Sequence, residues 1–327
     1  MKAIVQDTYG SADVLDLRDI DKPVVGDDDV LVRVHAASAH IGDWHIMTGL
    51  PYMLRIIART SGFGLRAPKA GVRGLDFAGR VEAVGKDVSR FQPGDEVFGT
   101  CDGSFAEYAT ARQDKVAPKP ANLTFEQAAT VPTSGFAALQ SLRDKGGVRP
   151  GQKVLIIGAG GAVGTFAVQI AKAFGAHVTG VCSTSKVDQV RSIGADEVID
   201  YTRVDFAESG QHYDLILDTA GARTLSQLRR ALTPRGTLVI VGAEGGGRWF
   251  GGFDRSLRAP MLSPFVSQKL RMLASKENGE DLVVLKDLIE AGKVTPVIDR
   301  TYPLSEVPEA IRHLEEGHAR GKVVITV

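Results

Sequence analysis

Hydrophobic and polar positions follow two different patterns along the chain, one up to about residue 120 and another from about Thr124. Up to about residue 120, turn residues separate short apolar runs, and Val30, Val32 and Val34 alternate with other side chains, which leaves one face of that segment apolar and the other mixed. This pattern predicts an antiparallel, barrel-like domain with strands over 2–6, 14–20, 29–38, 77–84, 96–100 and 105–110. Between residues 43 and 68 the strand signal lapses, and a short helix with loops is expected.

From about Thr124 the pattern alternates between strand and helix. Thr124 is the expected N-cap of a helix, with Gln127 at the capping-box position. Apolar strands follow near 153–157, 177–181, 197–199, 214–218 and 237–241, and the segments between them are helical or mixed. This is typical of a parallel sheet covered on both faces, so we expect a doubly wound domain. A strand at 268–275, helices near 280–291 and 305–316 and a final strand complete the chain.

One uncharged stretch, from Val154 to Ala171, reaches the 18 residues that a membrane-spanning helix requires at the least. Glycines at positions 158, 160, 161 and 164 fall inside it, and across them a continuous apolar run gives way to helical spacing. We therefore expect a buried strand, a turn and a helix here, and no membrane span.

The composition is that of an ordinary globular protein. Its 327 residues are 43% hydrophobic and 24% charged, a length that suits about two domains. Lys+Arg and Asp+Glu number 39 each, so the net charge of zero gives no reason to expect a nucleic-acid or anionic-membrane partner. Two cysteines are too few for a four-thiolate zinc lobe or a disulfide framework, and no signal peptide is visible, so a cytoplasmic location is expected.

The predicted strand, turn and helix around residue 160 carry the most informative motif. Ala159-x-Gly161-x-x-Gly164 is an alanine variant of the dinucleotide-binding fingerprint. Gly161 would let the backbone approach a pyrophosphate, and Gly164 would let the helix and the strand pack closely. The pyrophosphate would bind at the helix N-terminus, where unpaired N–H groups favour anions. The expected contacts are Ala159, Gly161, Ala162, Val163 and Gly164.

The end of the next strand bears on the choice between the two pyridine nucleotides. A site for NAD would place Asp or Glu about 20 residues beyond the fingerprint to bind the ribose hydroxyls, and the sequence has none there. Instead Ser183, Thr184, Ser185 and Lys186 supply three hydroxyls and a cation, which suit a 2′-phosphate, with no carboxylate to repel it. This favours NADPH over NADH. The alternative is that the hydroxyls cap the following helix and that Lys186 is solvated.

Further motifs lie in order along the chain: GLDFAGRVEAVG (74–85), PGDEVFG (93–99), LTFEQAATVPTSGFAAL (123–139), SIGADEVIDY (192–201) and ARGKVVI (319–325). Together with the fingerprint they resemble the medium-chain dehydrogenase/reductase superfamily, and within it the zinc-free quinone oxidoreductases of the zeta-crystallin-like and reticulon-interacting branches. The resemblance implies an α/β protein. Its GroES-like, mainly antiparallel catalytic domain would comprise 1–122 and 264–327, and its Rossmann NADP(H)-binding domain 123–263.

Zinc-dependent members of the superfamily bind the catalytic metal through a Cys, a His–Glu pair and a second Cys. In this chain the resemblance puts His40, Leu75–Asp76 and a residue near Thr130 at those places, and the four-cysteine structural lobe is absent. A catalytic zinc site needs three protein ligands and an open position, and Leu75 cannot bind metal. We therefore expect no zinc. The alternative is an improvised site built from His40, Asp43, His45 or Asp76.

The segment from Ala36 to His45 resembles the family stretch A-A-S-V-N-P-x-D-W, which closes a strand and faces the nicotinamide. Where the family has Asn, this chain has His40, which could donate to a carbonyl or enolate oxygen or supply a proton, because imidazole titrates near neutrality. The alternative is a structural histidine satisfied by the backbone. Asp43, a second catalytic candidate, is expected to cap the turn rather than act as a base. His45 is either a substrate contact or a solvated histidine.

Other candidates lie in loops that are expected to border a cleft. Trp44, Tyr52, Trp249, Phe250 and Phe253 could stack on a flat acceptor or pack between domains. Asp218 ends a strand and is expected to form the turn after it. The resemblance implies further cofactor contacts by Thr133 and Val241–Gly242 near the nicotinamide, by Tyr201 near the adenine ribose and by Lys322 at the cofactor edge.

These observations predict an NADPH-dependent, zinc-free oxidoreductase that reduces a quinone or an α,β-unsaturated carbonyl. Hydride added to the far end of a conjugated system leaves its charge on a delocalised enolate, which needs hydrogen bonds and a proton rather than a Lewis acid. The alternatives are a reductase of enoyl thioesters, a zinc alcohol dehydrogenase and a non-catalytic NADPH-binding protein. The strand at 268–275 is expected at a sheet edge, which favours a homodimer.

Overall fold

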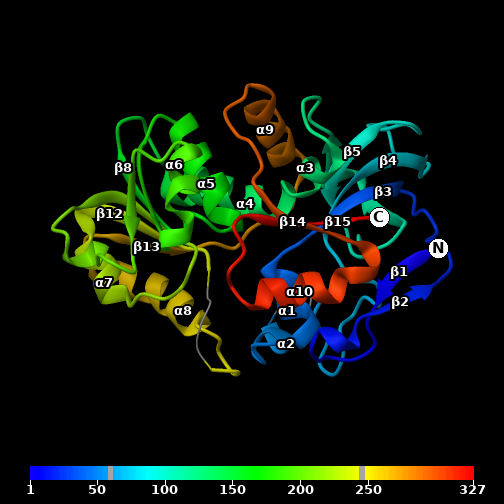
Figure 1. The fold of residues 1–327 in the computed structure, drawn as a ribbon, viewed down its shortest axis with the longest axis horizontal. Coiled ribbons are helices and arrows are strands. Elements are labelled where there is room, and N and C mark those ends of the chain that lie inside the picture. Colours follow the sequence, from blue (N-terminus) through cyan, green and yellow to red (C-terminus); the bar gives the residue numbers. More distant parts are fainter. Residues whose placement is uncertain (58–61, 243–246) are drawn as a thin grey trace. The chain divides into compact units, whose positions relative to one another are not determined.

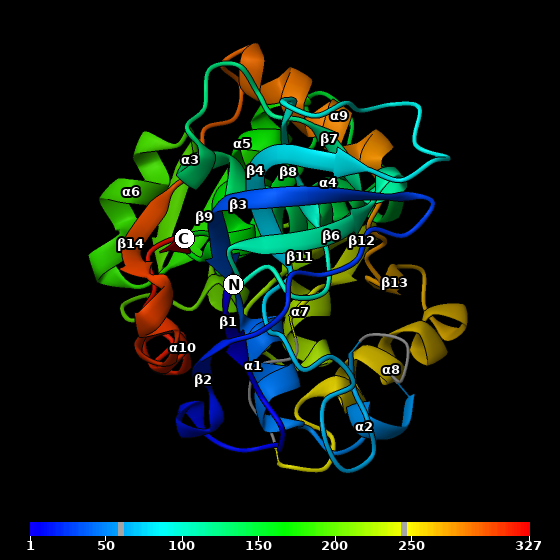
Figure 2. The same cartoon turned by 90° about the vertical axis from the view of Figure 1, so that its right-hand side faces the viewer.

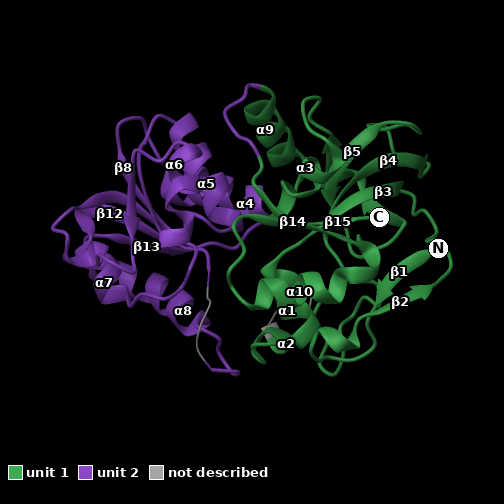
Figure 3. Cartoon of the chain, in the orientation of Figure 1, with its two compact units in different colours: residues 1–133, 277–290, 296–327 green, residues 134–276, 291–295 purple. Residues whose placement is uncertain are grey.

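The structure is a computed structural model that describes residues 1–57, 62–242 and 247–327. It divides into two compact units (Figure 3). Unit 1 comprises Met1–Thr133, Glu277–Glu290 and Pro296–Val327, and unit 2 comprises Ser134–Lys276 and Ala291–Thr295. Both ends of the chain therefore belong to unit 1.

Unit 1 is built on a seven-stranded sheet in which β3 (Asp29–Ala39) is the longest strand. Along one edge β3 pairs with β4, and along the other it pairs first with β6 and then with β15, an arrangement that Figure 2 shows for β3, β4 and β6. All pairs are antiparallel except β14 with β15. The sheet order is β14 (Ile298–Pro303), β15 (Lys322–Thr326), β3, β4 (Asp76–Val84), β5 (Glu96–Thr100), β7 (Val116–Pro118), with β6 (Tyr108–Arg112) on β3. A separate antiparallel pair is formed by β1 (Lys2–Val5) and β2 (Asp16–Asp19).

The two faces of β3 bury different cores. Val30, Val32 and Val34 lie in one apolar cluster with Phe77 and Val97, which confirms the alternation read from the sequence. Further along β3, Ala37 and Ala39 lie in a second cluster with residues of α1 (Ile41–Thr48) and α10 (Val307–Glu315). The remaining helices of unit 1 are α2 (Leu54–Ile57), α3 (Phe125–Ala129) and α9 (Gly279–Glu290).

Unit 2 is a doubly wound α/β unit. Its six strands are all parallel, and they follow the order β10 (Glu197–Asp200), β9 (His177–Cys182), β8 (Lys153–Ile157), β11 (Tyr213–Asp218), β12 (Leu232–Ile240), β13 (Lys269–Met272). Figure 1 shows α5 (Ala162–Ala173) and α6 (Val187–Ser192) on one face of this sheet and α7 (Leu225–Arg230) and α8 (Phe253–Leu262) on the other. The α/β fold class is thus confirmed, with α4 (Pro132–Gln140) at the junction of the two units in the chain.

The observed elements differ from the prediction in a few places. Unit 1 continues to Thr133 because α3 packs on β3 and β4, and unit 2 continues to Lys276 because β13 pairs with β12. The strand predicted over 105–110 lies at Tyr108–Arg112. The uncharged stretch from Val154 forms β8 and most of α5, as expected. In the described ranges, no helix has the length and hydropathy that crossing a membrane requires.

Candidate functional site

The glycine-rich turn of unit 2 leads from β8 into a helix whose N-terminus is open. Gly158 has a φ of +82°, which favours glycine, and the chain then enters α5 with Gly161 as its N-cap. A helix leaves the N–H groups of its first turn without intrahelical partners, and Gly161 has no side chain to cap them. Ala162 and Val163 are partly exposed, whereas the helix from Gly164 onward is largely buried. These amides can therefore bind an anion.

The third glycine of the motif permits close packing, as predicted. A Cβ atom at Gly164 would lie 2.1 Å from the carbonyl oxygen of Gly158 and 2.7 Å from Cα of Ala159. No side chain fits there, so the start of α5 is held against the end of β8.

Lys186 lies beside the same turn. A Cβ atom at Gly160 would lie 2.8 to 2.9 Å from the aliphatic carbons of Lys186, so the stem of this lysine lies over the glycine backbone. Ser183 and Ser185 come from the same short segment, with their hydroxyl oxygens 3.5 Å apart. Tyr201 is 53% exposed and its N–H donates to the carbonyl of Cys182 (3.1 Å). The structure thus brings Ser183, Ser185, Lys186 and Tyr201 to one edge of the sheet.

Contrary to the expectation from the sequence, a carboxylate lies beside Thr184. Asp200, at the end of β10, pairs in register with Cys182 at the end of β9. Its Oδ2 accepts from the hydroxyl of Thr184 (2.6 Å), and Thr202 donates twice to its Oδ1. These hydrogen bonds hold the pKa of Asp200 below its usual value. The carboxylate was missed because it comes from the neighbouring strand, and Thr184 is already engaged with it.

The ends of β11 and β12 form a second structured turn. Oδ1 of Asp218 accepts from the N–H groups of Ala220 (3.2 Å) and Gly221 (3.0 Å), which confirms the predicted turn. Its Oδ2 lies 2.5 Å from Nη1 of Arg255, which is 11% exposed, and no spacing in the sequence predicts this ion pair. Arg255 also donates to the carbonyl of Gly242 (3.3 Å), so it holds the end of β12, where Val241 and Gly242 lie.

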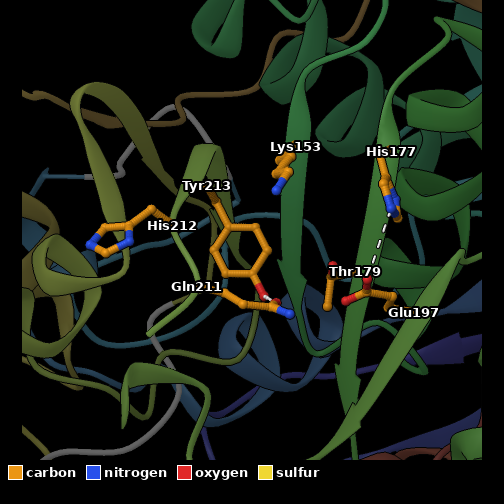
Figure 4. A pocket seen from close by; sticks show the side chains of 7 residues that line it. All are labelled: Lys153, His177, Thr179, Glu197, Gln211, His212 and Tyr213. Carbon is orange, nitrogen blue, oxygen red and sulfur yellow. Dashed lines mark hydrogen bonds and ion pairs between the residues drawn. The ribbon is translucent and has the colours of Figure 1, made fainter. Parts of the chain in front are cut away.

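A small cavity of about 40 Å³ lies at the opposite edge of the same sheet (Figure 4). Most of its lining residues begin strands, such as Lys153 of β8 and Tyr213 of β11. Ligands of parallel sheets bind at the carboxyl ends of the strands, so this cavity is not part of the candidate site. Its lining consists of Lys153, His177, Thr179, Glu197, Gln211, His212 and Tyr213.

In unit 1, His40 caps α1 with its side chain. The N–H of Gly42 donates to Nδ1 of His40 (3.0 Å), and Oδ2 of Asp43 accepts from the backbone N–H of His40 (2.9 Å). Because Nδ1 accepts, a neutral imidazole carries its hydrogen on Nε2. His40 is only 7% exposed, and Nε2 has no hydrogen-bond partner among the described residues. Nε2 lies 3.6 Å from Oδ2 of Asp43, which is beyond hydrogen-bonding distance, so the histidine is satisfied at Nδ1 and keeps a buried donor at Nε2.

Gly42 makes room for this ring. A Cβ atom at Gly42 would lie 2.7 Å from Cε1 and 2.8 Å from Nδ1 of His40. Asp43 caps the turn, as expected, and its Oδ1 is buried without a partner in the described part of the chain.

His45 is neither a free nor a fully solvated histidine. It is partly buried, and its Nδ1 bonds the carbonyl oxygen of Leu50 (2.8 Å), so this nitrogen carries the hydrogen. Burial lowers the pKa of His45, and nearby His40 lowers it further. At neutral pH the ring is therefore uncharged, with Nε2 as an acceptor.

Lys322 and Asp76 form an ion pair in the interior of unit 1. Nζ of Lys322 lies 3.2 Å from Oδ2 of Asp76, and both side chains have no exposed surface. Oδ1 of Asp76 accepts from the N–H (3.1 Å) and the hydroxyl (2.5 Å) of Thr133. Asp76 thus connects Thr133 and Lys322, two residues expected to contact the cofactor. From the sequence, Asp76 itself was considered only as a metal ligand.

The comparisons with known proteins agree with this arrangement. Residues 26–121 match the alcohol dehydrogenase GroES-like domain, 193–325 the zinc-binding dehydrogenase family, and 138–224 the C-terminal domain of alanine dehydrogenase/PNT. The chain is 35% identical to the mitochondrial NAD(P)H oxidoreductase RTN4IP1 of Mus musculus, over 100% of this chain and 89% of that protein. It belongs to the medium-chain dehydrogenase/reductase superfamily.

Two further members of the superfamily are similar along nearly the whole chain. The 2-methylene-furan-3-one reductase of Solanum lycopersicum is 34% identical, over 99% of this chain and 79% of that protein. The solved structure of the quinone oxidoreductase from Coxiella burnetii has a TM-score of 0.87 at 31% identity, and the match covers 100% of this chain and 99% of that one. The chain is therefore related to the oxidoreductases of the superfamily, including its quinone oxidoreductases.

The places at which zinc-dependent members bind metal do not fit zinc in this chain. Nδ1 of His40 already accepts a hydrogen bond, and both oxygens of Asp76 are engaged with Lys322 and Thr133. The hydroxyl of Thr130 donates to the carbonyl of Gln127 (2.7 Å). The described residues contain no group of three or more His, Cys, Asp and Glu side chains that could hold a metal ion.

The aromatic candidates divide between the two units. Trp44 and Tyr52 are partly buried in unit 1, and the indole nitrogen of Trp44 has no partner among the described residues. Trp249 (68% exposed) and Phe250 (56%) lie in unit 2, with the partly buried Phe253 at the start of α8. The structure does not gather all five within one unit.

Proposed function

We propose that this protein is an NADPH-dependent, zinc-independent oxidoreductase that reduces quinones or α,β-unsaturated carbonyls. The observation that carries the proposal is the buried Nε2 of His40, which has no hydrogen-bond partner among the described residues and is a donor of the kind that an enolate oxygen requires. The relatives, which include a quinone oxidoreductase and a 2-methylene-furan-3-one reductase, support the same acceptor class.

The residues of unit 2 would hold the dinucleotide. The open amides at the start of α5 suit its diphosphate, and Ser183, Ser185, Lys186 and Tyr201 suit a 2′-phosphate. Thr184 is left out of this phosphate site, because its hydroxyl donates to Asp200. When bound, the nicotinamide supplies a hydride.

In this reaction His40 would act as a hydrogen-bond donor through Nε2, because its Nδ1 already accepts from the N–H of Gly42. The hydrogen bonds with Gly42 and Asp43 hold the cap, and Nε2, which lies 3.6 Å from Oδ2 of Asp43, would donate to the oxygen on which negative charge develops. His45 stays neutral and can accept a hydrogen bond through Nε2. Trp44 and Tyr52 offer apolar faces to a flat acceptor.

We also propose a homodimer in the cytoplasm. Within the described sheet of unit 2, β13 ends the strand order, so one of its edges has no neighbour. Exposed apolar side chains lie close by in the sequence on α8 and just after it, namely Leu257 (47%), Met261 (73%) and Phe265 (83%). A second copy would cover both the edge and these side chains. Both cysteines are free and buried, in keeping with a reducing compartment.

An acceptor panel tests the proposed activity. NADPH oxidation is followed at the nicotinamide absorbance with a quinone, an enone, a simple ketone and an enoyl thioester, each with and without a chelator. We expect turnover of the quinone or the enone that the chelator leaves unchanged. Turnover confined to the thioester or the simple ketone, inhibition by the chelator, or NADPH binding without turnover of any acceptor would each refute the proposal.

Variants at His40 test the role of its donor. His40→Leu removes the donor and should lower kcat/KM by roughly 100-fold, the usual effect of losing one such group. His40→Asn retains an N–H donor and should restore part of the loss. Equal activity of the leucine and asparagine variants would show that His40 does not contact the substrate.

A further inference from the structure

The chain passes between the two units after Thr133, Lys276, Glu290 and Thr295. Two of these crossings lie in segments without regular secondary structure, because residues 273–278 and 294–297 belong to neither a helix nor a strand. The backbone N–H and C=O groups of such segments need partners from elsewhere in the protein. At both places a glutamine side chain of unit 2 supplies them.

Gln140, the last residue of α4, holds Lys276. Its Nε2 donates to the carbonyl oxygen of Lys276 (2.7 Å), and its Oε1 accepts from the N–H of the same residue (2.9 Å). A glutamine amide offers an N–H donor and an oxygen acceptor, so it pairs with Lys276 as a residue of a neighbouring strand would. Gln140 is only 6% exposed, although glutamine is found mostly at protein surfaces.

Gln169, within α5, holds Thr295 in the same way. Its Nε2 donates to the carbonyl oxygen of Thr295 (3.0 Å), and its Oε1 accepts from the N–H of Thr295 (2.8 Å). Two residues further on the chain is already attached to unit 1, because the N–H of Lys322 donates to the carbonyl oxygen of Val297 (2.9 Å). In the sequence, Pro296 alone separates the two attachments.

The other two crossings are held from the side of unit 1. The N–H and the hydroxyl of Thr133 both donate to Asp76, and the side chain of Asn122 donates to the carbonyl oxygen of Ile289, next to Glu290 (2.9 Å). Each crossing is therefore attached within its own unit at, or one residue before, the boundary. Little slack chain connects the units, so a change in their relative arrangement must occur in the few backbone torsions between the attachments.

We propose that Gln140 and Gln169 are hinge clamps, which confine relative motion of the two units at these two crossings to the junctions directly after Lys276 and Thr295. Units joined in this way are expected to move as rigid bodies about a few backbone torsions. Without the clamps, the segments around Lys276 and Thr295 can detach from unit 2, which lengthens the connection. The inference does not depend on a bound dinucleotide or on the proposed reaction.

Hydrogen exchange tests the clamps themselves. Gln140→Met and Gln169→Met keep the approximate length of each side chain and remove its hydrogen bonds. Exchange of the Lys276 amide in the first variant, and of the Thr295 amide in the second, should become about five- to tenfold faster, the effect of losing one hydrogen bond. The rates are measured by NMR or mass spectrometry, with the unfolding midpoint of each variant as a check on folding.

A pair of spin labels tests the hinge. The labels are attached to cysteines that replace Val24 in unit 1 and Arg235 in unit 2, which are both exposed, whereas the native cysteines are buried. Double electron–electron resonance then gives the distribution of distances between the labels. This distribution should be broader in the variant that combines Gln140→Met with Gln169→Met than in the labelled parent.

Gln113→Met is the matched control. The side chain of Gln113 also bridges backbone groups, because it donates to the carbonyl oxygen of Asp87 (3.1 Å) and accepts from the N–H of Ser89 (3.4 Å). All three residues lie within unit 1, away from the boundaries in the sequence. This variant should leave the distance distribution as narrow as in the parent.

The outcomes separate this inference from the proposed function. Unchanged exchange of both amides, an unchanged distribution in the double variant, or equal broadening by Gln113→Met would each overturn the hinge role of the two glutamines. Should the double variant not fold, the two single variants decide the matter, and each should broaden the distribution. Neither measurement needs a ligand, so failure of the protein to bind NADPH would refute the proposed function and leave this inference standing.

Discussion

Two helix N-termini, of α5 in unit 2 and of α1 in unit 1, show how differently the chain treats the same structural problem. At α1 the side chains of His40 and Asp43 satisfy backbone groups around the cap. At α5 the N-cap is Gly161, which makes no side-chain hydrogen bond to the first turn. Both ends carry the positive end of a helix dipole. One end is closed by the protein, and the other is the end at which we propose that the dinucleotide binds.

The two ends would contribute different groups to the proposed function: backbone amides at α5 and a side-chain nitrogen at α1. In the proposed site at α5 the backbone itself would be the binding group, so small residues are needed there and no particular side chain is. At α1 backbone groups around the cap are already satisfied, and the functional group that we propose is the remaining nitrogen of the capping side chain, Nε2 of His40. Substitutions at the open end of α5, at the closed end of α1, at Lys186 and Asp200, and at His45 test this comparison.

Closing the open end should have the largest effect. Gly161→Asp adds a good N-cap at a φ of −94°, and the new Cβ would meet only the Gly158 carbonyl oxygen at 3.4 Å. The variant should be as stable as the parent or more stable, yet bind NADPH at least about 100-fold more weakly, because its carboxylate occupies the amides and repels the diphosphate. Calorimetry and thermal unfolding measure the two effects. The neutral control, Gly161→Ala, should retain most of the affinity; undiminished binding by the aspartate variant would place the diphosphate elsewhere.

Disturbing the closed end should affect turnover and spare cofactor binding. Gly42→Ala puts a methyl group within 2.8 Å of the His40 ring, so the ring must move. A displacement of about 1 Å at a reacting group costs up to about 100-fold in rate, and we expect kcat/KM for the acceptor to fall roughly 30-fold at unchanged NADPH affinity. Gly71→Ala is the control, since its Cβ would meet only Val5 at 4.0 Å. If both alanine variants retain full activity, the aim of the His40 ring does not matter.

Removing the cation beside the glycine turn should separate the two nucleotides. Lys186→Ala should weaken NADPH binding about tenfold and NADH binding less than twofold, because only NADPH carries a 2′-phosphate. Asp200→Asn is the complementary variant: it removes the carboxylate charge next to Thr184 and should strengthen NADPH relative to NADH. Equal weakening of both nucleotides by Lys186→Ala would contradict a 2′-phosphate site at this edge.

The smallest effect concerns His45 and the pH dependence of stability. Its pKa is lowered by burial, so below the unfolded value of about 6.5 the unfolded chain binds more protons than the folded one, and stability falls as the pH falls through this window. His45→Asn keeps a donor for the Leu50 carbonyl and cannot titrate. Urea unfolding at pH 7.5 and 5.5 should show a smaller loss for the variant. His35, whose pKa burial also lowers, should preserve part of the slope. An unchanged slope would show that His45 titrates normally.

The sequence predicts best what is local. The strand, glycine turn and helix from Lys153 to Ala173 are contiguous, so spacing alone placed them, and the alternation of Val30, Val32 and Val34 correctly identified a buried face. Asp200 was missed because it reaches Thr184 from the next strand, in a register that no local pattern contains. The same limit applies to Lys322 and Asp76: each stood out as a single residue, but their pairing depends on three neighbouring strands.

In the proposed reaction, hydride reaches the far end of a conjugated acceptor while Nε2 of His40 donates to the acceptor oxygen, on which negative charge develops. Deuterated NADPH, labelled on the transferred hydrogen at C4 of the nicotinamide, tests this claim most directly with a cyclic enone as acceptor and mass spectrometry or NMR of the product. We predict a saturated ketone with deuterium on the β-carbon. An allylic alcohol with deuterium on the former carbonyl carbon would contradict the claim.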